Sequence, residues 1–284
     1  MKNVLLTGWQ GFIGSHIYDA IQHDFEVKLF HGDVTNLMDC ERNLRDIHTV
    51  LHLASVTYAP LFYDVPDIVM DTQIKGTLNL LRNHKLFARF ILFSSAHVYG
   101  KQTIFPTDED SIPNPLEPYS VSKLAAEQLL KCYGDINGFD YVMLRPQNNY
   151  GPRQNYQFLI PTLIQQALTE RKMRLKGNSQ RMFIYVADTV DAVRRLLLAT
   201  HWPHHLYNLA GAQTWWISEV AAKIAEQTGV TEPIDIAPTH PRVVDVPKFE
   251  ASYQRILTDF GWSPRISIDE GLARTIAYYR GQHA

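Results

Sequence analysis

A tyrosine and a lysine in the middle of the sequence have the spacing that a proton-transfer site needs. In the stretch LEPYSVSKLAAEQLL, Tyr119 and Lys123 lie four residues apart at the start of an apolar pattern of helical period, so a helix would place both on one face. A lysine ammonium beside a phenol favours the phenolate, and we therefore expect Lys123 to lower the pKa of Tyr119 toward neutrality. Such a tyrosine can exchange a proton with an alcohol or sugar oxygen while a hydride moves. The alternative interpretation is a surface pair with no chemical role.

Two serines could add a hydroxyl to this chemistry. Ser94 and Ser95 follow the apolar run Phe90–Phe93 in the stretch FILFSSAHVYG. A serine at the carboxyl end of a strand could hydrogen-bond the same substrate oxygen as Tyr119, because α/β proteins bind ligands at that end of the sheet. A serine that merely ends the strand would look the same in the sequence.

Three glycines near the N-terminus have the pattern of a phosphate-binding turn. Gly8, Gly11 and Gly14 fall every third residue after the apolar run Val4–Leu6, and an apolar pattern of helical period begins at Phe12. In a strand–turn–helix unit the backbone N–H groups and the positive end of the helix dipole point at one spot, and the missing side chains let a phosphate approach. We therefore predict a nucleotide site here rather than an ordinary glycine turn.

Alternating strands and helices would position these residues. Short apolar runs recur with room for a helix between them, at Val4–Leu6, Glu26–Phe30, Val50–Leu53, Phe90–Phe93 and Tyr141–Leu144. Amphipathic stretches predict helices at Thr72–His84, Val121–Tyr133 and Ile160–Arg171. This alternation predicts an α/β fold with a Rossmann-type, doubly wound parallel sheet.

The character of the sequence changes after Pro152, which divides the chain into two predicted parts. We expect residues 1–152 to form a dinucleotide-binding domain, to which segments near 181–211 return. Residues 153–180 and 212–284 would then form a smaller C-terminal substrate-binding lobe.

The composition argues against several classes of partner. The chain has 284 residues, of which 27 are basic and 29 acidic, and a net charge of -2 gives no field that would attract nucleic acid or an anionic membrane. Its two cysteines, Cys40 and Cys132, and its 12 histidines lack metal-ligand spacing, so we expect neither a disulfide framework nor a metal site. No apolar stretch has membrane-spanning length, and the first strand begins too early for a signal peptide, so we expect a cytoplasmic protein.

Taken together, these segments resemble the extended short-chain dehydrogenase/reductases, the nucleotide-sugar epimerase/dehydratase family, over almost the whole chain. TGWQGFIGSH looks like the family's TGxxGxxG loop, HGDVTN like its adenine-side element, VLHLAS like its HxAA strand end, YSVSK like its YxxxK pair and SSAHVYG like its SSxxVYG segment. RPQNNYGPRQ, QRMFIYVADTVDA and PRVVDVPKFEASYQRILTDFGWSPRISIDEGL are similar to later segments of the family.

This resemblance implies a role for particular residues. The expected NAD(P) contacts are Gly8, Gly11, Phe12, Ile13, Gly14, His31, Asp33, Val34, Leu53, Ala54, Tyr119 and Lys123. The expected catalytic residues are Tyr119, Lys123 and Ser95, with Ser94 as the alternative hydroxyl. Asn148, Arg181 and Arg242 would bind the substrate diphosphate, which suits the guanidinium fork of arginine, and Ser95 would also contact the sugar.

One departure from the family pattern concerns the cofactor. His31 follows the second predicted strand, where many NAD-using relatives carry an acid that bonds the ribose 2′-hydroxyl. Without a carboxylate to repel a 2′-phosphate, NADPH becomes admissible, although the sequence shows no arginine placed to bind it. We expect NAD or NADP, with a preference for NADP. The short passage from this strand to HGDVTN resembles the reductase branches of the family more than the long-looped epimerases.

Two further departures concern the chemistry. Gln73 stands where the family usually has asparagine, so the role of that position is open. Ala96 and His97 stand where the family's dehydratases carry an Asp-Glu pair for water elimination, which disfavours a 4,6-dehydratase. His97 could instead exchange protons near neutral pH, or it could simply line the pocket.

The resemblance and these departures predict an enzyme that moves hydride at C4 of a sugar carried on a nucleoside diphosphate. Tyr119 would handle the proton on the C4 oxygen, Ser95 would bond that oxygen, and Lys123 would hold the nicotinamide ribose. The same machinery serves a 4-epimerase, which keeps its cofactor, and a 4-keto-sugar reductase, which exchanges it, and the sequence leaves both open. The alternative is a non-catalytic NAD(P)-binding regulator of the same fold. Because family members often pair through two helices each, we also expect a homodimer.

Overall fold

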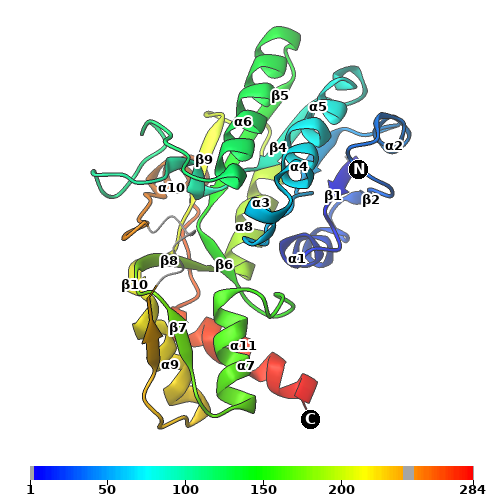
Figure 1. Cartoon of the computed structure of the whole chain (residues 1–284). Helices are drawn as coiled ribbons and strands as arrows, with labels where there is room; N and C mark the ends of the chain where they lie inside the picture. Colours follow the sequence, from blue (N-terminus) through cyan, green and yellow to red (C-terminus); the bar gives the residue numbers. More distant parts are fainter. Residues whose placement is uncertain (1–2, 239–245, 284) are drawn as a thin grey trace.

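The apolar runs of the sequence form one parallel sheet, as predicted. The computed structural model describes residues 3–238 and 246–283. In it six strands lie in the order β2-β1-β3-β4-β5-β9, and every neighbouring pair is parallel (Figure 1). Since β2 and β3 lie on opposite sides of β1, the switch point of the sheet falls between β1 and β3, where doubly wound sheets bind ligands. The strands are β1 (Asn3–Thr7), β2 (Glu26–Leu29), β3 (Thr49–His52), β4 (Arg89–Phe93), β5 (Asp140–Pro146) and β9 (Leu206–Leu209).

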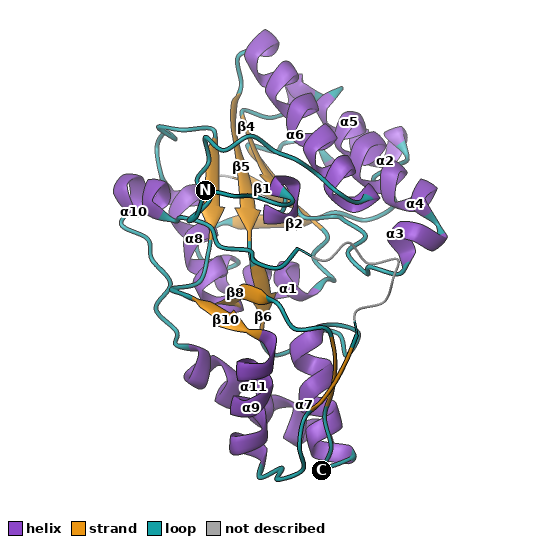
Figure 2. Ribbon diagram, turned by 60° about the vertical axis from the view of Figure 1, so that its left-hand side comes forward, coloured by secondary structure: helices purple, strands orange, loops and turns teal. Residues whose placement is uncertain are grey.

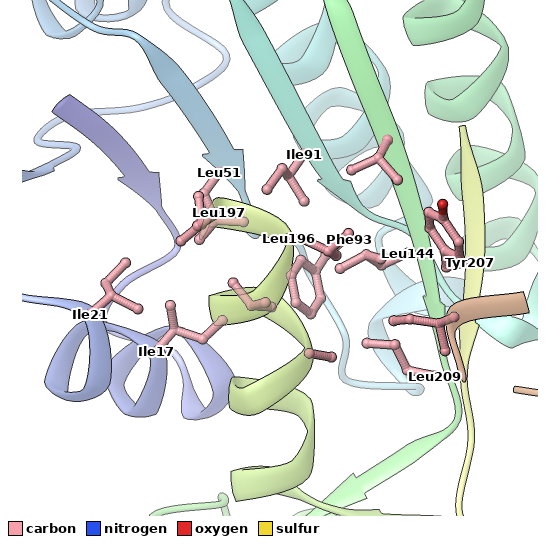
Figure 3. Close-up of a cluster of buried hydrophobic side chains, with 14 of the residues drawn as sticks. Ile17, Ile21, Leu51, Ile91, Phe93, Leu144, Leu196, Leu197, Tyr207 and Leu209 are labelled. Atoms are coloured by element: carbon pink, nitrogen blue, oxygen red, sulfur yellow. The ribbon is translucent and has the colours of Figure 1, made fainter. Parts of the chain in front are cut away.

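Helices cover both faces of this sheet. Alternate residues of a strand point to opposite sides, so Leu51 and Phe93 pack toward α1 and α8 (Figure 3), whereas Val50 and Leu92 pack toward α2, α5 and α6. Burial of both faces explains why the strands read as continuous apolar runs. The helices are α1 (Phe12–Ile21), α2 (Leu37–Asn43), α5 (Gly76–Leu81), α6 (Pro118–Asn137) and α8 (Val186–Leu198).

The helix that carries the Tyr/Lys pair is longer than the predicted Val121–Tyr133. Pro118 occupies the first turn of α6, where a missing N–H costs nothing, and Glu117 and Ser120 cap the helix reciprocally. The helix ends at Gly138, which adopts a left-handed conformation with φ of 72°. Tyr119 therefore lies in the first turn, at the end of α6 that faces the carboxyl edge of the sheet.

The helix predicted at Thr72–His84 is broken into pieces. It begins earlier, as α4 (Pro66–Met70), widens into a π-helical turn at Asp71–Lys75, and continues as α5. Gln73 lies in the π-helical turn and is buried. Short helical turns, α3 (Leu61–Asp64), a 3-10 turn at His84–Leu86 and another at Ala96–Tyr99, complete this half.

The C-terminal elements build a second layered unit beside the carboxyl edge of the sheet (Figure 2). A three-stranded sheet has the order β10-β8-β6, a two-stranded sheet pairs β11 with β7, and helices pack around them on a separate apolar core. The elements are β6 (Asn148–Tyr150), α7 (Leu159–Thr169), β7 (Arg174–Lys176), β8 (Gln180–Tyr185), β10 (Thr214–Trp216), α9 (Ile217–Thr228), β11 (Asp235–Ala237) and α11 (Ile268–His283). Helix α10 (Gln254–Phe260) packs instead against β9 of the six-stranded sheet.

The lobe boundaries that the sequence suggests stay a prediction, but the position of each segment is clear. Within 181–211, α8 and β9 lie with the six-stranded sheet, whereas β8 belongs to the three-stranded sheet. Ile256 of α10 and Trp262 pack in the same core as α8 and β9, although they fall in the range 212–284. In the described part of the chain, no helix combines the length and the apolar character that crossing a membrane requires.

Candidate active site

A cleft of about 890 Å³ lies beyond the carboxyl ends of the strands, between the two units. It brings together most of the residues that the sequence singles out, from segments more than a hundred residues apart. The predicted residues that line it are Gly8, Gly11, Phe12, Ile13, Gly14, Leu53, Ser94, Ser95, His97, Tyr119, Lys123, Asn148 and Arg181. His31, Asp33, Val34 and Ala54 lie outside this lining, and Arg242 lies outside the described residues.

The glycine turn has the geometry of a phosphate cradle. Gly8 has φ of 69°, and a Cβ there would meet the backbone N of Ala54 at 2.7 Å. A Cβ on Gly14 would meet the carbonyl oxygen of Gly8 at 2.2 Å, so the turn can only be this tight without side chains. Gly11 precedes α1 and offers no side chain to cap it, which leaves the first N–H groups of the helix for a ligand. These residues fit a bound dinucleotide phosphate.

The end of β2 presents a histidine rather than a carboxylate. The His31 backbone is fixed by Asn43, whose side chain accepts from its N–H at 3.1 Å and donates to its carbonyl at 2.9 Å. The exposed His31 ring lies edge-on to the Trp9 ring, with the ring centres 5.9 Å apart. The carboxylate of Asp33 accepts a hydrogen bond from the backbone N–H of Thr35, two residues away, at 2.8 Å.

Three other predicted cofactor contacts, Val34, Leu53 and Ala54, have backbone groups that are hydrogen-bonded to neighbouring side chains. The Val34 side chain is buried, and its carbonyl accepts from Asn79 at 3.1 Å. The N–H groups of Leu53 and Ala54 both donate to the Thr7 hydroxyl, at 3.1 and 3.0 Å. The Thr7 hydroxyl in turn bonds Nδ1 of His52 at 2.7 Å, and Nε2 of His52 bonds Thr77 at 3.1 Å. Burial, with a further contribution from the Lys123 charge, lowers the pKa of His52 to about 3, so this buried ring is neutral.

Tyr119 and Ser95 both line the cleft, and the Ser95 side chain is close enough to the phenol to oppose the rise in its pKa. The Tyr119 ring is 9% exposed and stacks on Phe62 with ring centres 4.7 Å apart. Ser95 also caps the turn that follows it, accepting from the N–H of His97 at 3.2 Å. The hydroxyl of Ser94 is buried and has no hydrogen-bond partner within the described residues. Of the two serines, Ser95 is the one whose geometry matches a hydroxyl acting together with Tyr119.

The pKa of Tyr119 differs from the sequence-based expectation. Burial raises the pKa of Tyr119 to about 12, a rise that the neighbouring Ser95 side chain opposes and the Glu117 charge supports. The Lys123 ammonium does not reach the phenol; it donates to the Phe93 carbonyl at 2.7 Å and lies 5.9 Å from the Tyr119 ring centre. Burial lowers the pKa of Lys123 itself to about 7, opposed by the Glu127 charge. The expected lowering of the tyrosine pKa is therefore wrong for the protein by itself, because desolvation dominates and Lys123 is not among the groups that lower it.

His97 is paired with a carboxylate at the mouth of the same site. Its Nδ1 lies 2.9 Å from Oε1 of Glu117, the capping residue of α6. The imidazole stacks on Phe249 with ring centres 5.1 Å apart and meets the Tyr119 ring edge-on at 6.1 Å. The His97 side chain is 41% exposed, so it lies between Tyr119 and solvent.

The expected diphosphate-binding residues lie on the opposite wall. Arg181 donates to the carbonyls of Gln180 and Val246, at 2.9 and 2.7 Å, and its guanidinium lies 4.9 Å from the Phe249 ring. Asn148 donates to the Met182 carbonyl at 3.1 Å. Phe249 thus contacts both His97 and Arg181 in the lining of the cleft.

Several lining residues escaped the sequence analysis. Phe62, Glu117, Phe249 and Arg153 all line the cleft. Glu117 carries no usual N-cap signal, because helix N-caps prefer Ser, Thr, Asp and Asn. Arg153, which pairs with Asp19 at 2.8 Å and has φ of 68°, carries no local signal, and neither do the two phenylalanines.

Comparison with known proteins gives this site a family. Residues 4–210 match the model of the NAD dependent epimerase/dehydratase family. GDP-6-deoxy-D-mannose reductase from Pseudomonas aeruginosa is 31% identical, with 95% of each chain covered. Among solved structures, UDP-glucose 4-epimerase from Thermotoga maritima with UDP-glucose has a TM-score of 0.92 at 26% identity, covering 99% of this chain and 100% of that one. RMD from Pseudomonas aeruginosa, complexed with NADPH, has a TM-score of 0.91 at 27% identity with the same coverage.

The chain therefore belongs to the NAD dependent epimerase/dehydratase family, and it is an enzyme of the extended short-chain dehydrogenase/reductase type. This confirms the family and the fold class inferred from the sequence motifs. The cofactor type of this family is NAD(P).

Proposed function

We propose that this protein moves hydride at C4 of a nucleoside-diphosphate sugar, as a 4-epimerase or a 4-keto-sugar reductase. The observation that carries the proposal is that Tyr119, Ser95 and Lys123 line the same cleft as the glycine turn. Two hydroxyls that converge on one spot suit a sugar oxygen that is an alcohol in one state and a carbonyl in the other.

The residues that would hold the cofactor are the glycine turn, the first turn of α1 and Lys123. When bound there, the nicotinamide supplies or accepts the hydride. We favour NADP over NAD, because the end of β2 presents the exposed His31 and the nearby Asp33 carboxylate is engaged by the Thr35 N–H. Similar solved structures contain either cofactor: RMD from Pseudomonas aeruginosa was solved with NADPH, and UDP-glucose 4-epimerase from Thermus thermophilus with NAD.

The proton is handled by Tyr119. With a pKa raised to about 12, the phenol is protonated at neutral pH and can donate to the C4 oxygen as that oxygen gains charge. Ser95 donates to or accepts from the same oxygen and fixes its position. In the oxidative direction Tyr119 must first lose its proton, because only the phenolate can accept the proton of the C4 hydroxyl. A charged Lys123 would favour that phenolate.

The remaining residues of the cleft would orient the substrate and exclude side reactions. Arg181 and Asn148, together with Arg242, would bind the diphosphate. His97, held by Glu117, would act as a second acid/base group near the sugar. Ala96 has no titratable group, so we propose hydride transfer at C4 rather than 4,6-dehydration, although the family name includes dehydratases.

The chain is similar to proteins named for each of the two activities: a UDP-glucose 4-epimerase and a GDP-6-deoxy-D-mannose reductase. Denaturing the freshly purified protein without added cofactor and identifying the released nucleotide separates them. Near-stoichiometric NAD would mean a retained, recycling cofactor and an epimerase. Protein that releases no nucleotide, and then binds NADPH more tightly than NADH, would be a reductase. Release of an unrelated nucleotide, with no binding of either dinucleotide, would refute the proposal.

We also propose a homodimer that pairs through α4–α5 and α6. Ile68 on α4 and Val121 on α6 are 54% and 43% exposed, and the two helices pack side by side, so they present apolar side chains to solvent together. Light scattering of the purified protein would give twice the chain mass for a dimer, and the single-chain mass would refute it.

A further inference from the structure

An arginine on the loop after β6 reaches across to the helix that starts at the glycine turn. Arg153 lines the cleft, and its Nη1 lies 2.8 Å from Oδ2 of Asp19 on α1. Its Nε lies 3.3 Å from Nε2 of His16 on the same helix. Because Phe12, His16 and Asp19 are spaced by four and three residues, they share one face of α1. Arg153 therefore lies along the helix face that begins at the predicted phosphate cradle.

The first turn of α1 is close to this arginine. His16 follows Phe12 by four residues, which is about 6 Å along the helix axis. The two rings meet edge-on with their centres 5.6 Å apart. Phe12 lines the cleft and opens the helix whose first N–H groups no side chain caps. A shift of the guanidinium by about one helical turn, from Asp19 toward Phe12, would bring it to an anion bound at those N–H groups.

The contacts that hold Arg153 in the structure are weak. Both side chains of the ion pair are partly exposed, Arg153 at 34% and Asp19 at 55%, and exposed pairs contribute little to stability. Nε2 of His16 donates to the Pro152 carbonyl at 2.8 Å, so this nitrogen carries the proton and cannot also accept from Arg153. A diphosphate offers more charge than one carboxylate and suits the guanidinium fork, so it would bind Arg153 more strongly than Asp19 does.

Arg153 is the cation that the cleft offers beside α1. The other lysine and arginine side chains among the described lining residues are Lys123 and Arg181, and both donate to backbone carbonyls elsewhere in the cleft. Burial lowers the pKa of His16, so its ring is uncharged at neutral pH. A dinucleotide diphosphate carries one negative charge on each phosphate, whereas the N-terminus of a helix supplies only about half a positive charge. A cation beside the cradle would therefore add to the binding.

We propose that Arg153 is a further cofactor-binding residue, which leaves Asp19 and binds the diphosphate of the dinucleotide at the N-terminus of α1. Asp19 then competes with the cofactor for the guanidinium. This inference rests on the cofactor site of the proposed function, but it does not depend on the reaction at C4.

The competition predicts effects of opposite sign on the Kd for a dinucleotide. Arg153→Asn removes the charge, and asparagine tolerates the left-handed backbone of this position, where φ is 68°. Loss of a charge-assisted contact should raise the Kd roughly 10- to 100-fold. Asp19→Asn frees Arg153 from an exposed ion pair and should lower the Kd about two- to five-fold. The double variant should bind like Arg153→Asn alone, because Asp19 acts through the arginine.

Asp24→Asn is the matched control for the change in charge. Asp24 lies just beyond the end of α1, is half-buried like Asp19, and pairs with Arg194 at 2.7 Å instead of with Arg153. Neither Asp24 nor Arg194 lines the cleft. This variant removes the same charge as Asp19→Asn and should leave the Kd unchanged.

The experiment is calorimetric titration of the full-length variants with NADH, NADPH and ADP-ribose, and separately with UDP and GDP, after thermal unfolding has shown that each variant is folded. NADH, NADPH and ADP-ribose share the diphosphate but differ in the nicotinamide and the 2′-phosphate, so each variant should shift all three by the same factor. UDP and GDP report on the sugar-nucleotide side of the cleft, and their affinities should stay unchanged. Where the purified protein already carries nucleotide, the rate of its exchange against isotopically labelled NAD gives the same ranking.

The outcomes separate this inference from a structural role of the same residues. Weaker binding by Arg153→Asn together with tighter binding by Asp19→Asn supports the inference. Weaker binding by both variants would mean that the ion pair only holds the loop against α1, which would overturn the inference. Unchanged affinities, or a loss confined to UDP and GDP, would overturn it too.

The same titrations distinguish this inference from the proposed function. A wild-type protein that binds none of NADH, NADPH and ADP-ribose would overturn the proposed cofactor site together with the role of Arg153. The expected shifts in a protein that converts no sugar nucleotide would refute the proposed reaction and leave the role of Arg153 standing.

Discussion

The tightest contact in the proposed cofactor site gives a graded prediction. A Cβ on Gly14 would lie 2.2 Å from the carbonyl oxygen of Gly8, about 1.2 Å short of ordinary van der Waals contact at 3.4 Å. Gly14→Ala must therefore displace the turn by roughly an ångström, which is enough to break hydrogen bonds from its N–H groups to a phosphate. Two charge-assisted hydrogen bonds are worth about 3–6 kcal/mol together, so the Kd for NAD(P)H should rise roughly 10²- to 10⁴-fold.

Two other glycines complete the series. At Gly11 the added Cβ would meet the Gly8 carbonyl at 3.2 Å, which is tight but close to tolerable, so Gly11→Ala should weaken binding less. At Gly281 the Cβ would meet nothing within 4 Å, and this variant should bind like the wild type. Calorimetric titration with NADPH and NADH measures all three, and thermal unfolding checks that each is folded. A folded Gly14→Ala variant that binds both dinucleotides as well as Gly281→Ala would refute the assignment of the cradle.

Three further predictions concern the chemistry and its pH dependence. Tyr119→Phe should lower turnover of a sugar nucleotide by roughly 10²- to 10⁴-fold while cofactor affinity, measured by fluorescence titration, stays near the wild type; a variant that turns over the substrate as fast as the wild type would refute the catalytic role of Tyr119. His97→Asn and Glu117→Gln should alter the pH–rate profile in the same way if the His97–Glu117 pair exchanges protons. Profiles identical to the wild type would mean that His97 only lines the cleft. His52 is neutral in the fold, with a pKa lowered from 6.5 to about 3, so its contribution to stability is complete above pH 6.5 and is lost as the pH falls toward 3. Denaturant unfolding should show a slope of up to about 1.4 kcal/mol per pH unit in that window, reduced in His52→Asn; an unchanged slope would mean that His52 is not the group responsible.

Most of the sheet and the nucleotide turn could be read from the sequence because both depend on local signals. The runs at Val4–Leu6 and Phe90–Phe93 are apolar throughout, as strands buried on both faces must be. The glycine spacing reports a turn too tight for side chains, and the contacts at Gly8 and Gly14 bear this out.

The electrostatics of the site could not be read in the same way. The spacing of Tyr119 and Lys123 predicts a lowered tyrosine pKa, but burial of both groups reverses the sign, and burial is set by Phe62 and by strands far away in sequence. Gln73 shows the same limit: its amide bonds Ser55 at 2.9 Å and Ser122 at 2.8 Å, which ties the π-helical turn to α6. A single sequence gives the residue types but not these distant partners.

The most direct test of the central claim follows the hydrogen at C4. The protein would be incubated with nucleoside-diphosphate hexoses, and with their 4-keto derivatives plus NADPH deuterated at the transferable position, and the products read by NMR. A 4-epimerase would invert C4 and retain its hydrogen, whereas a 4-keto-sugar reductase would deliver deuterium to C4. Neither change should occur with the Tyr119→Phe variant. If the protein binds the cofactor but changes none of these substrates at C4, the proposed hydride transfer at C4 is contradicted.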